Sequence, residues 1–439
     1  MIASEFKSTN YQDILTKIAP ELCQADNKVL NSKRLPHLKH VIKIDNQAHT
    51  GMHRFQDLLT APTTHMLKKL QHIASELQFD ETINIQFTSG TTGNPNGTML
   101  THNNILNNGY FVGEAIHLSP QDRVCISVPL FHCFGMVMGN LACITHGSTM
   151  VYPSAVFNPL DTLKAIQQEK CTAAYGVPTM FIAILEHEQF DEFDLSSLRT
   201  GIMAGSPCPQ EIMQRVIDRM HMSQITICYG MTETTPVSAQ SSTEDSVERR
   251  VSTVGRVHPH LEVKIVDEEG KVVPRGQLGE LCVRGYSVML GYWDEHDKTQ
   301  EVIDVARWMH TGDIAEMDDE GFVKIKGRIK DVVIRGGENL FPKEIEDFLY
   351  THDAVCDVQV IGVPDHRYGE ELCACIILHE HHECTEEAIR QYCAEHISHN
   401  KVPRYVRFFS EFPMTASGKA QKFKLREFMR EELNLKEIA

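Results

Sequence analysis

The chain has 439 residues, of which 42% are hydrophobic, and a formal net charge of −17 at pH 7. This composition predicts a globular protein of two or more domains with a large core. The acidic balance excludes a nucleic-acid-binding protein, because polyanions require clustered Lys and Arg, so any phosphate ligand is expected to be small. No apolar run approaches the roughly eighteen residues of a membrane-spanning helix. Thirteen scattered cysteines indicate reduced thiols rather than disulfides.

The first 80 residues or so predict mixed helices and loops, without a chemical motif. Apolar residues recur there at helical spacing in two places. These residues are Ile14, Ile18 and Leu22 in the first place, and Leu70, Ile73 and Leu77 in the second.

Residues 86–98 form a glycine- and hydroxyl-rich segment that follows a short β-type run and precedes an expected helix. Glycines allow the backbone to approach an anion closely, so that successive N–H groups can converge on a phosphate. The Gly-x4-Gly-Lys-[Ser/Thr] spacing of P-loop NTPases is absent from the sequence. We interpret the segment as a phosphate-binding loop, with an ordinary turn as the alternative. Its candidate ligands are Thr88, Ser89, Gly90, Thr91, Thr92 and Gly93.

Between about residues 83 and 240, short apolar runs alternate with helical stretches, which predicts layered α/β structure. The runs lie at 124–128, 173–177 and 224–228, and the helical stretches at 159–169 and 210–220. From about 251 to 326 the pattern changes to strands at 261–266, 279–283 and 321–325 separated by glycine turns, which indicates an antiparallel sheet.

The pattern changes again after residue 327, to a compact tail that mixes helices and strands. The predicted elements are strand 332–335, helix 343–350, strands 357–363 and 371–378, helix 385–397 and strand 405–410. The predicted domains are therefore residues 1–327 and 328–439.

A second candidate site, Tyr-Gly-Met-Thr-Glu at 229–233, follows an apolar strand. Ligands of open α/β sheets bind at the carboxyl ends of strands. Tyr229 can offer a flat face to a base, Thr232 can donate to a phosphate, and Glu233 can hold Mg²⁺. An ordinary turn is the alternative.

Four further groups suggest the same kind of ligand. Gly205 and Ser206 follow an apolar run, Asp313 can accept hydrogen bonds from ribose hydroxyls, and Arg328 can assist it. Lys419 follows a flexible Ser-Gly and can reach a phosphate or carboxylate as a mobile charge. Each group also has a structural interpretation, as a turn or a surface ion pair.

In their order along the chain, these motifs resemble the adenylate-forming superfamily, which includes acyl-CoA synthetases, luciferases and nonribosomal adenylation domains. The resemblance covers essentially the whole chain. Its motifs are Thr-Ser-Gly-Thr-Thr-Gly at 88–93, Thr-His at 101–102, Pro-Leu-Phe-His at 129–132, Tyr-Gly-Met-Thr-Glu at 229–233, Gly-Arg at 255–256, Gly-Glu at 279–280, Thr-Gly-Asp at 311–313, Gly-Arg-Ile-Lys-Asp at 327–331, Gly-Gly-Glu-Asn at 336–339 and Ser-Gly-Lys at 417–419. The strings at 284–293 and 422–427 are similar to those of the medium-chain acyl-CoA synthetases classed as family member 2.

The resemblance implies an α/β fold: a large N-terminal domain of layered α/β sheets with a small β-barrel-like subdomain, followed by a small mobile α+β domain. It implies a ligase that uses ATP, Mg²⁺ and coenzyme A to activate a fatty acid, in which acyl-adenylate and pyrophosphate form before the acyl group passes to CoA. Two alternatives stay open: a non-catalytic homologue that only binds nucleotide or a partner, and an adenylating enzyme with a carrier-protein thiol as acceptor.

The resemblance also implies roles for individual residues. Lys419 would bridge the carboxylate and the α-phosphate, Thr232 would bind the α-phosphate, and Glu233 would position Mg²⁺. His132 would lie at the mouth of an acyl pocket, and Lys330 at the hinge before the mobile domain. Adenine and ribose would contact Gly205, Ser206, Tyr229, Gly230, Asp313 and Arg328; the acyl chain would contact Phe134, Val177 and Met231; CoA would contact Gly336, Gly337 and Glu338.

Two departures from the family pattern carry expectations of their own. The phosphate loop usually reads Pro-Lys-Gly, whereas this chain has Asn96 in place of the lysine, so weaker ATP affinity or a lower rate is expected. Only about 87 residues precede the loop, so the usual first part of the N-terminal domain is expected to be missing, with a complementing fragment or a homo-oligomer as a partner.

The expected compartment is the cytoplasm, or the mitochondrial matrix if a longer precursor exists.

Overall fold

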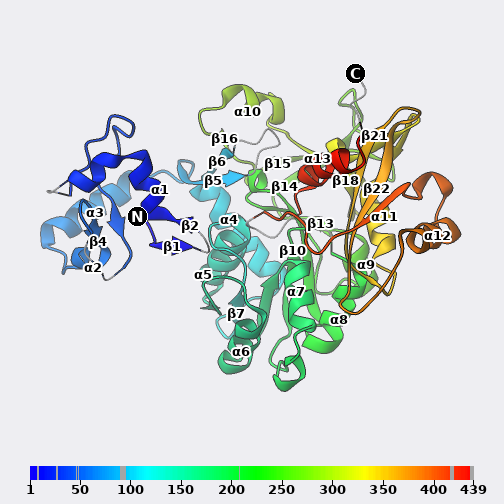
Figure 1. Cartoon of the computed structure of the whole chain (residues 1–439). Coiled ribbons are helices and arrows are strands. Elements are labelled where there is room, and N and C mark those ends of the chain that lie inside the picture. Colours follow the sequence, from blue (N-terminus) through cyan, green and yellow to red (C-terminus); the bar gives the residue numbers. More distant parts are fainter. Residues whose placement is uncertain are drawn as a thin grey trace. The chain divides into compact units, whose positions relative to one another are not determined.

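The computed structural model describes residues 1–6, 9–25, 28–45, 47, 49–88, 95–206, 208–415 and 420–435. The chain divides into two compact units, residues 1–78 and 79–439 (Figure 1). Among the described residues, no helix has both the length and the apolar character needed to cross a membrane.

The first unit is small and holds a core of its own. Both stretches of helical spacing are confirmed, although Leu22 falls in a short 3-10 helix, and every residue of α3 is exposed. The core residues are Ala19, Leu22, Leu30, Val41 and Met52. The elements are β1 (Glu5–Phe6), β2 (Thr9–Asn10), α1 (Tyr11–Ile18), η1 (Pro20–Gln24), β3 (Ile42–Lys43), β4 (His53–Arg54), α2 (Phe55–Leu58) and α3 (Thr64–Glu76).

The second unit is built around a seven-stranded sheet in the order β13-β12-β11-β10-β9-β7-β8. Neighbouring strands from β8 to β11 run parallel, whereas β12 and β13 are antiparallel additions at one edge. The strands are β7 (Arg123–Ile126), β8 (Thr149–Val151), β9 (Ala173–Gly176), β10 (Thr200–Ala204), β11 (Gln224–Gly230), β12 (Val237–Gln240) and β13 (Arg256–Val257).

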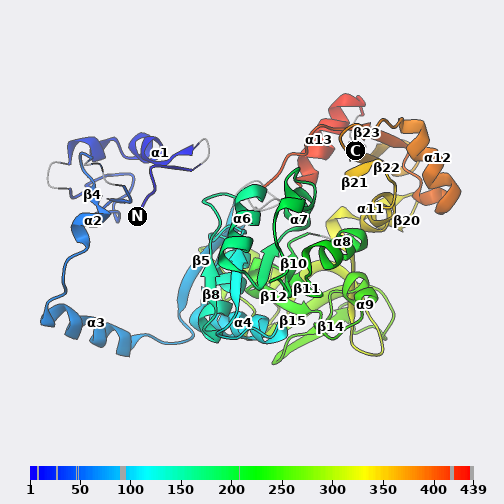
Figure 2. The same ribbon diagram turned by 90° about the horizontal axis from the view of Figure 1, so that it is seen from below.

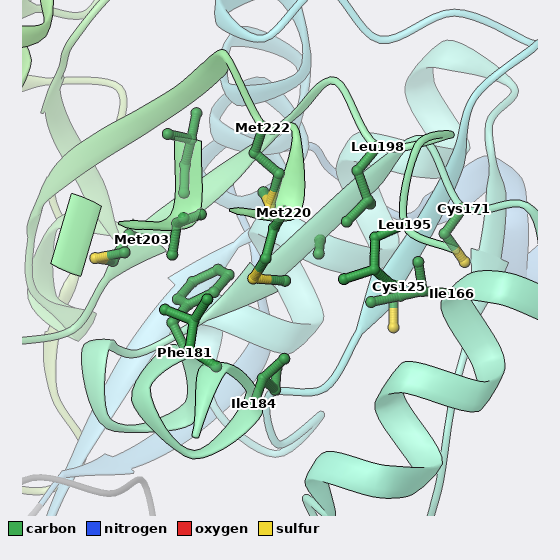
Figure 3. Close-up of a cluster of buried hydrophobic side chains, with 14 of the residues drawn as sticks. Cys125, Ile166, Cys171, Phe181, Ile184, Leu195, Leu198, Met203, Met220 and Met222 are labelled. Atoms are coloured by element: carbon green, nitrogen blue, oxygen red, sulfur yellow. The ribbon is translucent and has the colours of Figure 1, made fainter. Parts of the chain in front are cut away.

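Helices cover both faces of this sheet, because consecutive strand residues point to opposite sides. Met203 of β10 packs in one hydrophobic cluster with α6, α7 and α8, and its neighbour Ile202 packs in another with α4, η2 and α5. In Figure 2, α6 and α7 lie above β10 and α4 lies below it. Figure 3 shows Phe181, Met203 and Met220 within the first cluster. The helices are α4 (His102–Ala115), the π-helical segment η2 (Phe134–Leu141), α5 (Ala142–His146), α6 (Pro159–Glu169), α7 (Pro178–Leu185), α8 (Gln210–Met220) and α9 (Val247–Ser252). The predicted α/β layers are confirmed.

Two smaller sheets complete this part of the fold. Strands β14 (Leu261–Val266), β15 (Gly279–Gly285), β17 (Met309–Met317) and β18 (Val323–Arg328) form an antiparallel sheet, as expected. The Thr-Gly-Asp segment, for which a turn was the alternative, lies within β17. Strand β16 (Gly291–Tyr292) joins β6 (Asn96–Thr101) and β5 (Thr82–Thr88), and α10 (His296–Val302) follows β16.

The helix predicted after the glycine-rich loop is present, as α4, although it does not follow the loop directly. Strand β6 comes first, because Asn96 pairs with Thr88 and the two strands run antiparallel across the loop. Helix α4 begins only at His102, where Thr101 caps it: its Oγ1 accepts from the N–H of Asn104 at 3.0 Å. The two described ends of the loop, Thr88 and Asn96, therefore lie opposite each other in the paired strands.

The C-terminal elements follow the prediction within a few residues. Their sheet has the order β20-β19-β22-β21, with β23 parallel to β22. The predicted boundary after residue 327 stays a prediction. The elements are η5 (Ile329–Asp331), β19 (Val333–Arg335), β20 (Glu338–Leu340), α11 (Pro342–Leu349), β21 (Val355–Asp365), β22 (Gly369–Leu378), α12 (Glu386–His396), β23 (Tyr405–Phe408) and α13 (Lys422–Glu432).

Candidate active site

Three of the predicted site segments lie at one edge of the seven-stranded sheet. Val177 follows β9, Gly205 follows β10, and Tyr229 lies near the end of β11. These strands are adjacent and parallel, with Ala204 paired to Cys228 and Met203 paired to Gly176. Their carboxyl ends therefore coincide, at the edge where open α/β sheets bind ligands.

Tyr229 and Asp313 form a hydrogen-bonded pair at this edge. The Tyr229 hydroxyl donates to Asp313 Oδ2 at 2.6 Å, although 84 residues separate the two in sequence. Burial and the Asp313 carboxylate raise the pKa of Tyr229 well above its usual value, so the hydroxyl stays protonated and donates. Arg328 pairs with Asp313 in the β17–β18 ladder, and its Nε lies 3.5 Å from Asp313 Oδ1. The structure thus brings together three of the residues assigned to adenine and ribose.

Glu233 is held from two sides. Its side chain is 7% exposed, and its Oε1 accepts from the Tyr292 hydroxyl at 2.9 Å. Its backbone carbonyl accepts from the N–H of Met289 at 2.9 Å. Burial and Glu233 both raise the pKa of Tyr292, which keeps the phenol protonated as the donor. Sequence reasoning missed Tyr292, although it lies inside the family-like string at 284–293.

The residues at Glu233 fit a magnesium ion. The buried carboxylate and the neighbouring Thr232 hydroxyl present oxygen atoms, which Mg²⁺ prefers. Tyr292 occupies only one carboxylate oxygen of Glu233, as far as the described hydrogen bonds show.

Gly230 permits the chain to turn between Tyr229 and Thr232. A Cβ at this position would lie 1.7 Å from the carbonyl oxygen of Pro236, a clash with backbone that no side-chain movement can relieve. Any residue larger than glycine would displace one of the two backbone segments at the site.

The phosphate loop is described only at its two ends. Residues 89–94, which include five of the predicted phosphate ligands, lie outside the described residues, as does Lys419. Thr88 and Asn96 are described, as the last residue of β5 and the first of β6. Asn96 Oδ1 accepts from Lys298 Nζ at 3.4 Å. No sequence signal predicted the contact between Asn96 and Lys298.

The residues assigned to the acyl chain are buried or half-buried, and only two of them share a cluster. Phe134 and Val177 belong to the cluster beneath α4 and η2, where Phe134 stacks on Tyr175 with ring centroids 6.0 Å apart. Met231 packs against a different cluster, formed by residues of β6, η2 and β15. His132 Nδ1 accepts from the N–H of Phe134 at 3.1 Å, which fixes its ring beside Phe134.

The residues assigned to CoA form a hairpin turn in the C-terminal sheet. Gly336 and Gly337 have φ of 62° and 87° between β19 and β20, a left-handed pair that glycine adopts most readily. Glu338 Oε2 accepts from Asn400 Nδ2 at 2.7 Å. Lys330 lies in η5, and its neighbour Asp331 forms an ion pair with Arg426 at 2.6 Å.

Comparisons with known proteins identify the family. The model of the AMP-binding enzyme family matches residues 4–293, and that of the AMP-binding enzyme C-terminal domain matches 344–419. YngI of Bacillus subtilis is 50% identical over 436 residues, covering 99% of this chain and 79% of that protein. The mitochondrial medium-chain acyl-CoA ligase ACSF2 of Danio rerio is 47% identical over 435 residues, covering 98% of this chain and 72% of that protein.

Solved structures of related enzymes share the fold. The anthranilate CoA ligase AuaEII, in complex with anthranoyl-AMP, matches with a TM-score of 0.80 and 28% identity, covering 92% of this chain and 76% of that one. The o-succinylbenzoate CoA synthetase MenE of Bacillus subtilis, in complex with its acyl-adenylate intermediate, matches with a TM-score of 0.72 and 26% identity, covering 88% of this chain and 78% of that one. The chain therefore belongs to the AMP-binding enzyme family, and within it to the acyl-CoA synthetases, which activate a carboxylic acid with ATP before its transfer to CoA.

Proposed function

We propose that this enzyme converts a medium-chain fatty acid to its acyl-CoA, in fatty acid metabolism. A carboxylate oxygen of the acid attacks the α-phosphorus of ATP, and pyrophosphate leaves. The thiol of CoA then attacks the acyl carbon, and AMP leaves. Relatives named medium-chain acyl-CoA ligases support this chain length. The apolar side chains Phe134 and Val177 also support it, because each methylene buried there contributes about 0.8 kcal/mol.

The observation that carries the proposal is the joint placement of two acid–tyrosine pairs. Tyr229 and Glu233 belong to one short motif, and each pairs with a residue from another strand, Asp313 of β17 and Tyr292 of β16. The first pair presents an aromatic ring and a carboxylate, which suit adenine and ribose. The second presents a fixed carboxylate, which suits a metal-bound phosphate.

We assign the remaining roles as follows. The loop at 88–93 cradles the phosphates through Thr88, Ser89, Gly90, Thr91, Thr92 and Gly93, while Thr232 donates to the α-phosphate. Lys419 bridges the carboxylate and the α-phosphate and stabilises the charge that develops there. His132 borders the acid, and the turn at Gly336, Gly337 and Glu338 borders the CoA arm.

Glu233, with the Thr232 hydroxyl beside it, would hold Mg²⁺. When bound, the ion offsets the negative charge of the phosphates. The task of the protein is to keep the Glu233 carboxylate fixed in position, and the hydrogen bond from Tyr292 does this.

We further propose that residues 1–327 and 328–439 act as two domains joined at Lys330. The C-terminal domain would turn about this residue between the two half-reactions, removing Lys419 and presenting the turn at 336–338. Two family models that match on either side of this region support the division.

A direct test is ATP–pyrophosphate exchange measured across a series of saturated fatty acids, with CoA thioester formation measured in parallel. We expect exchange to peak with medium-chain acids and to be lost in Lys419→Ala. Absence of exchange with every acid would favour the non-catalytic homologue. Exchange without CoA thioester would favour a carrier-protein acceptor, and exchange that survives Lys419→Ala would refute the role given to that lysine.

Partners and compartment are also proposals. The exposed apolar residues Leu67, Leu70 and Leu77 on and after α3 support a second copy of the chain or a separate complementing segment as their cover. Mass measurement in solution would test this. We propose the cytoplasm as the compartment, with the mitochondrial matrix as the alternative supported by the mitochondrial relatives.

A further inference from the structure

The phosphate loop of this chain lacks a lysine of its own, but a lysine from another element lies beside it. Lys298 of α10 approaches Asn96, which stands where the resemblance leads one to expect that lysine. The Lys298 Nζ to Asn96 Oδ1 distance is 3.4 Å, and 202 residues separate the two in sequence. The positive charge therefore lies at the base of the loop, although a neutral amide occupies the loop position.

Helix α10 is held against the hairpin that carries the loop. Trp293 N–H donates to the Gly97 carbonyl at 2.7 Å, and β16 pairs with β6. Tyr292 N–H donates to Thr299 Oγ1 at 2.9 Å, which ties α10 to β16. Because Tyr292 also donates to Glu233, Lys298 is fixed relative to the proposed metal carboxylate.

The other contact of Lys298 is one that a nucleotide can replace. Its Nζ lies 2.9 Å from Glu295 Oε1, and the two side chains are 34% and 45% exposed. An exposed ion pair of this kind contributes little to stability, because solvent screens both charges. A triphosphate carries several negative charges, so it competes well with a single solvated carboxylate for the ammonium group.

We propose that Lys298 binds the β- and γ-phosphates of ATP and supplies the cation that Asn96 does not. The inference rests on the proposed function, since it assigns a residue to the same ATP site. It predicts that the contribution of Lys298 is confined to the triphosphate end, because adenine, ribose and the α-phosphate contact other residues.

The test compares the affinity of the full chain for Mg·ATP with its affinity for AMP, by calorimetry. In Lys298→Met, we expect the dissociation constant for Mg·ATP to rise roughly tenfold or more while that for AMP is unchanged. Lys298→Arg should retain ATP affinity, because the charge remains. Adding Asn96→Lys to Lys298→Met should restore it.

The matched control is Lys170→Met. Lys170 also forms an exposed ion pair, with Asp194 at 3.4 Å, but it precedes β9 and so lies at the opposite end of the strands from the site. An unchanged ratio of ATP affinity to AMP affinity in Lys298→Met would overturn the inference, whether both affinities fall to the same degree or neither falls. Absence of pyrophosphate exchange in the parent would count against the proposed function alone, because the ATP-to-AMP ratio does not depend on turnover.

Discussion

At the scale of single residues, the site depends on two phenol groups that each donate to a carboxylate. Tyr229 fixes Asp313 and Tyr292 fixes Glu233, at 2.6 and 2.9 Å. Both phenols have raised pKa values, so both remain donors across the neutral range. Each carboxylate is thereby oriented before any ligand arrives, which avoids reorganisation during the reaction.

Removing one phenol hydroxyl tests this orientation. Tyr292→Phe should lower the rate of pyrophosphate exchange about tenfold and raise the Mg²⁺ concentration needed for half-maximal rate, because a hydrogen bond to a buried charge is lost. Tyr152→Phe is the control, since it removes a hydroxyl bonded to Asn140 at 2.9 Å on the exposed surface. Equal effects of the two substitutions would contradict the role of Tyr292.

The buried side chain of His258 should make the free energy of unfolding depend on pH. It is 4% exposed, its Nε2 donates to Gln240 Oε1 at 2.9 Å, and burial lowers its pKa to about 4. In the unfolded chain His258 binds a proton near pH 6.5, whereas in the folded chain it does so only near pH 4. The contribution of His258 to stability is therefore fully present above about pH 6.5, and it is lost as the pH falls from there to about 4. The loss attributable to His258 should reach roughly 3 kcal/mol.

Thermal unfolding measured between pH 7 and 4 checks this expectation. His258→Gln should flatten the fall in melting temperature over that range, because the glutamine does not titrate. His296→Gln, which changes a histidine on the exposed face of α10, is the control. A slope that stays the same in His258→Gln would mean that other groups cause the fall.

At the scale of elements, the ends of strands decide where the chemistry lies. Parallel strands β9, β10 and β11 end together and present Val177, Gly205 and Tyr229 at one edge. Strands β5 and β6 flank the segment proposed to bind phosphate, and Trp293, between β16 and α10, holds β6 through its hydrogen bond to Gly97. Backbone pairing between elements, more than any one side chain, sets the distances in the site.

Gly230 at the end of β11 tests the importance of this backbone geometry. Gly230→Ala should destabilise the fold by roughly 3 kcal/mol and abolish ATP binding, because the added methyl group meets the Pro236 carbonyl. Gly270→Ala is the control for backbone strain without a clash, since Gly270 also has a positive φ, of 78°, but its Cβ would have nothing within 4 Å. Normal ATP affinity in Gly230→Ala would show that the turn can relax without consequence.

At the scale of the whole molecule, the proposed catalytic cycle uses groups from both the central sheet and the C-terminal elements. The residues proposed to bind ATP belong to the sheet edge and to β17 and β18, whereas the glycine turn at 336–337 and Lys419 come after Lys330 in the sequence. The Asp331–Arg426 ion pair links η5 to α13, so this connection is anchored on its C-terminal side. A hinge at Lys330 would therefore move the later elements as one body.

Restricting the hinge should separate the two half-reactions. Lys330→Pro limits backbone rotation, so we expect CoA thioester formation to fall about tenfold or more while pyrophosphate exchange stays near the parent rate. Lys330→Ala removes the side chain without restricting rotation and should retain both activities. A parallel loss of both half-reactions in Lys330→Pro would argue against a hinge at this residue.

The sequence by itself determined the class of fold, and it predicted most of the candidate site. The alternation of apolar runs and helical stretches predicted α6 and α8 to the residue, because a helix that covers a sheet must repeat its apolar face every three to four positions. The order of the motifs indicated the adenylating chemistry and named Tyr229, Glu233, Asp313 and Arg328.

Only the tertiary structure decided how these residues are held. The strand β6, which lies between the loop and helix α4, results from pairing with β5, and β5 comes before the loop in the sequence. Tyr292 and Lys298 are ordinary residues in the sequence, and they reach Glu233 and Asn96 across 59 and 202 positions. Contacts of that separation depend on the register of strands and the packing of helices, which no local pattern of residues encodes.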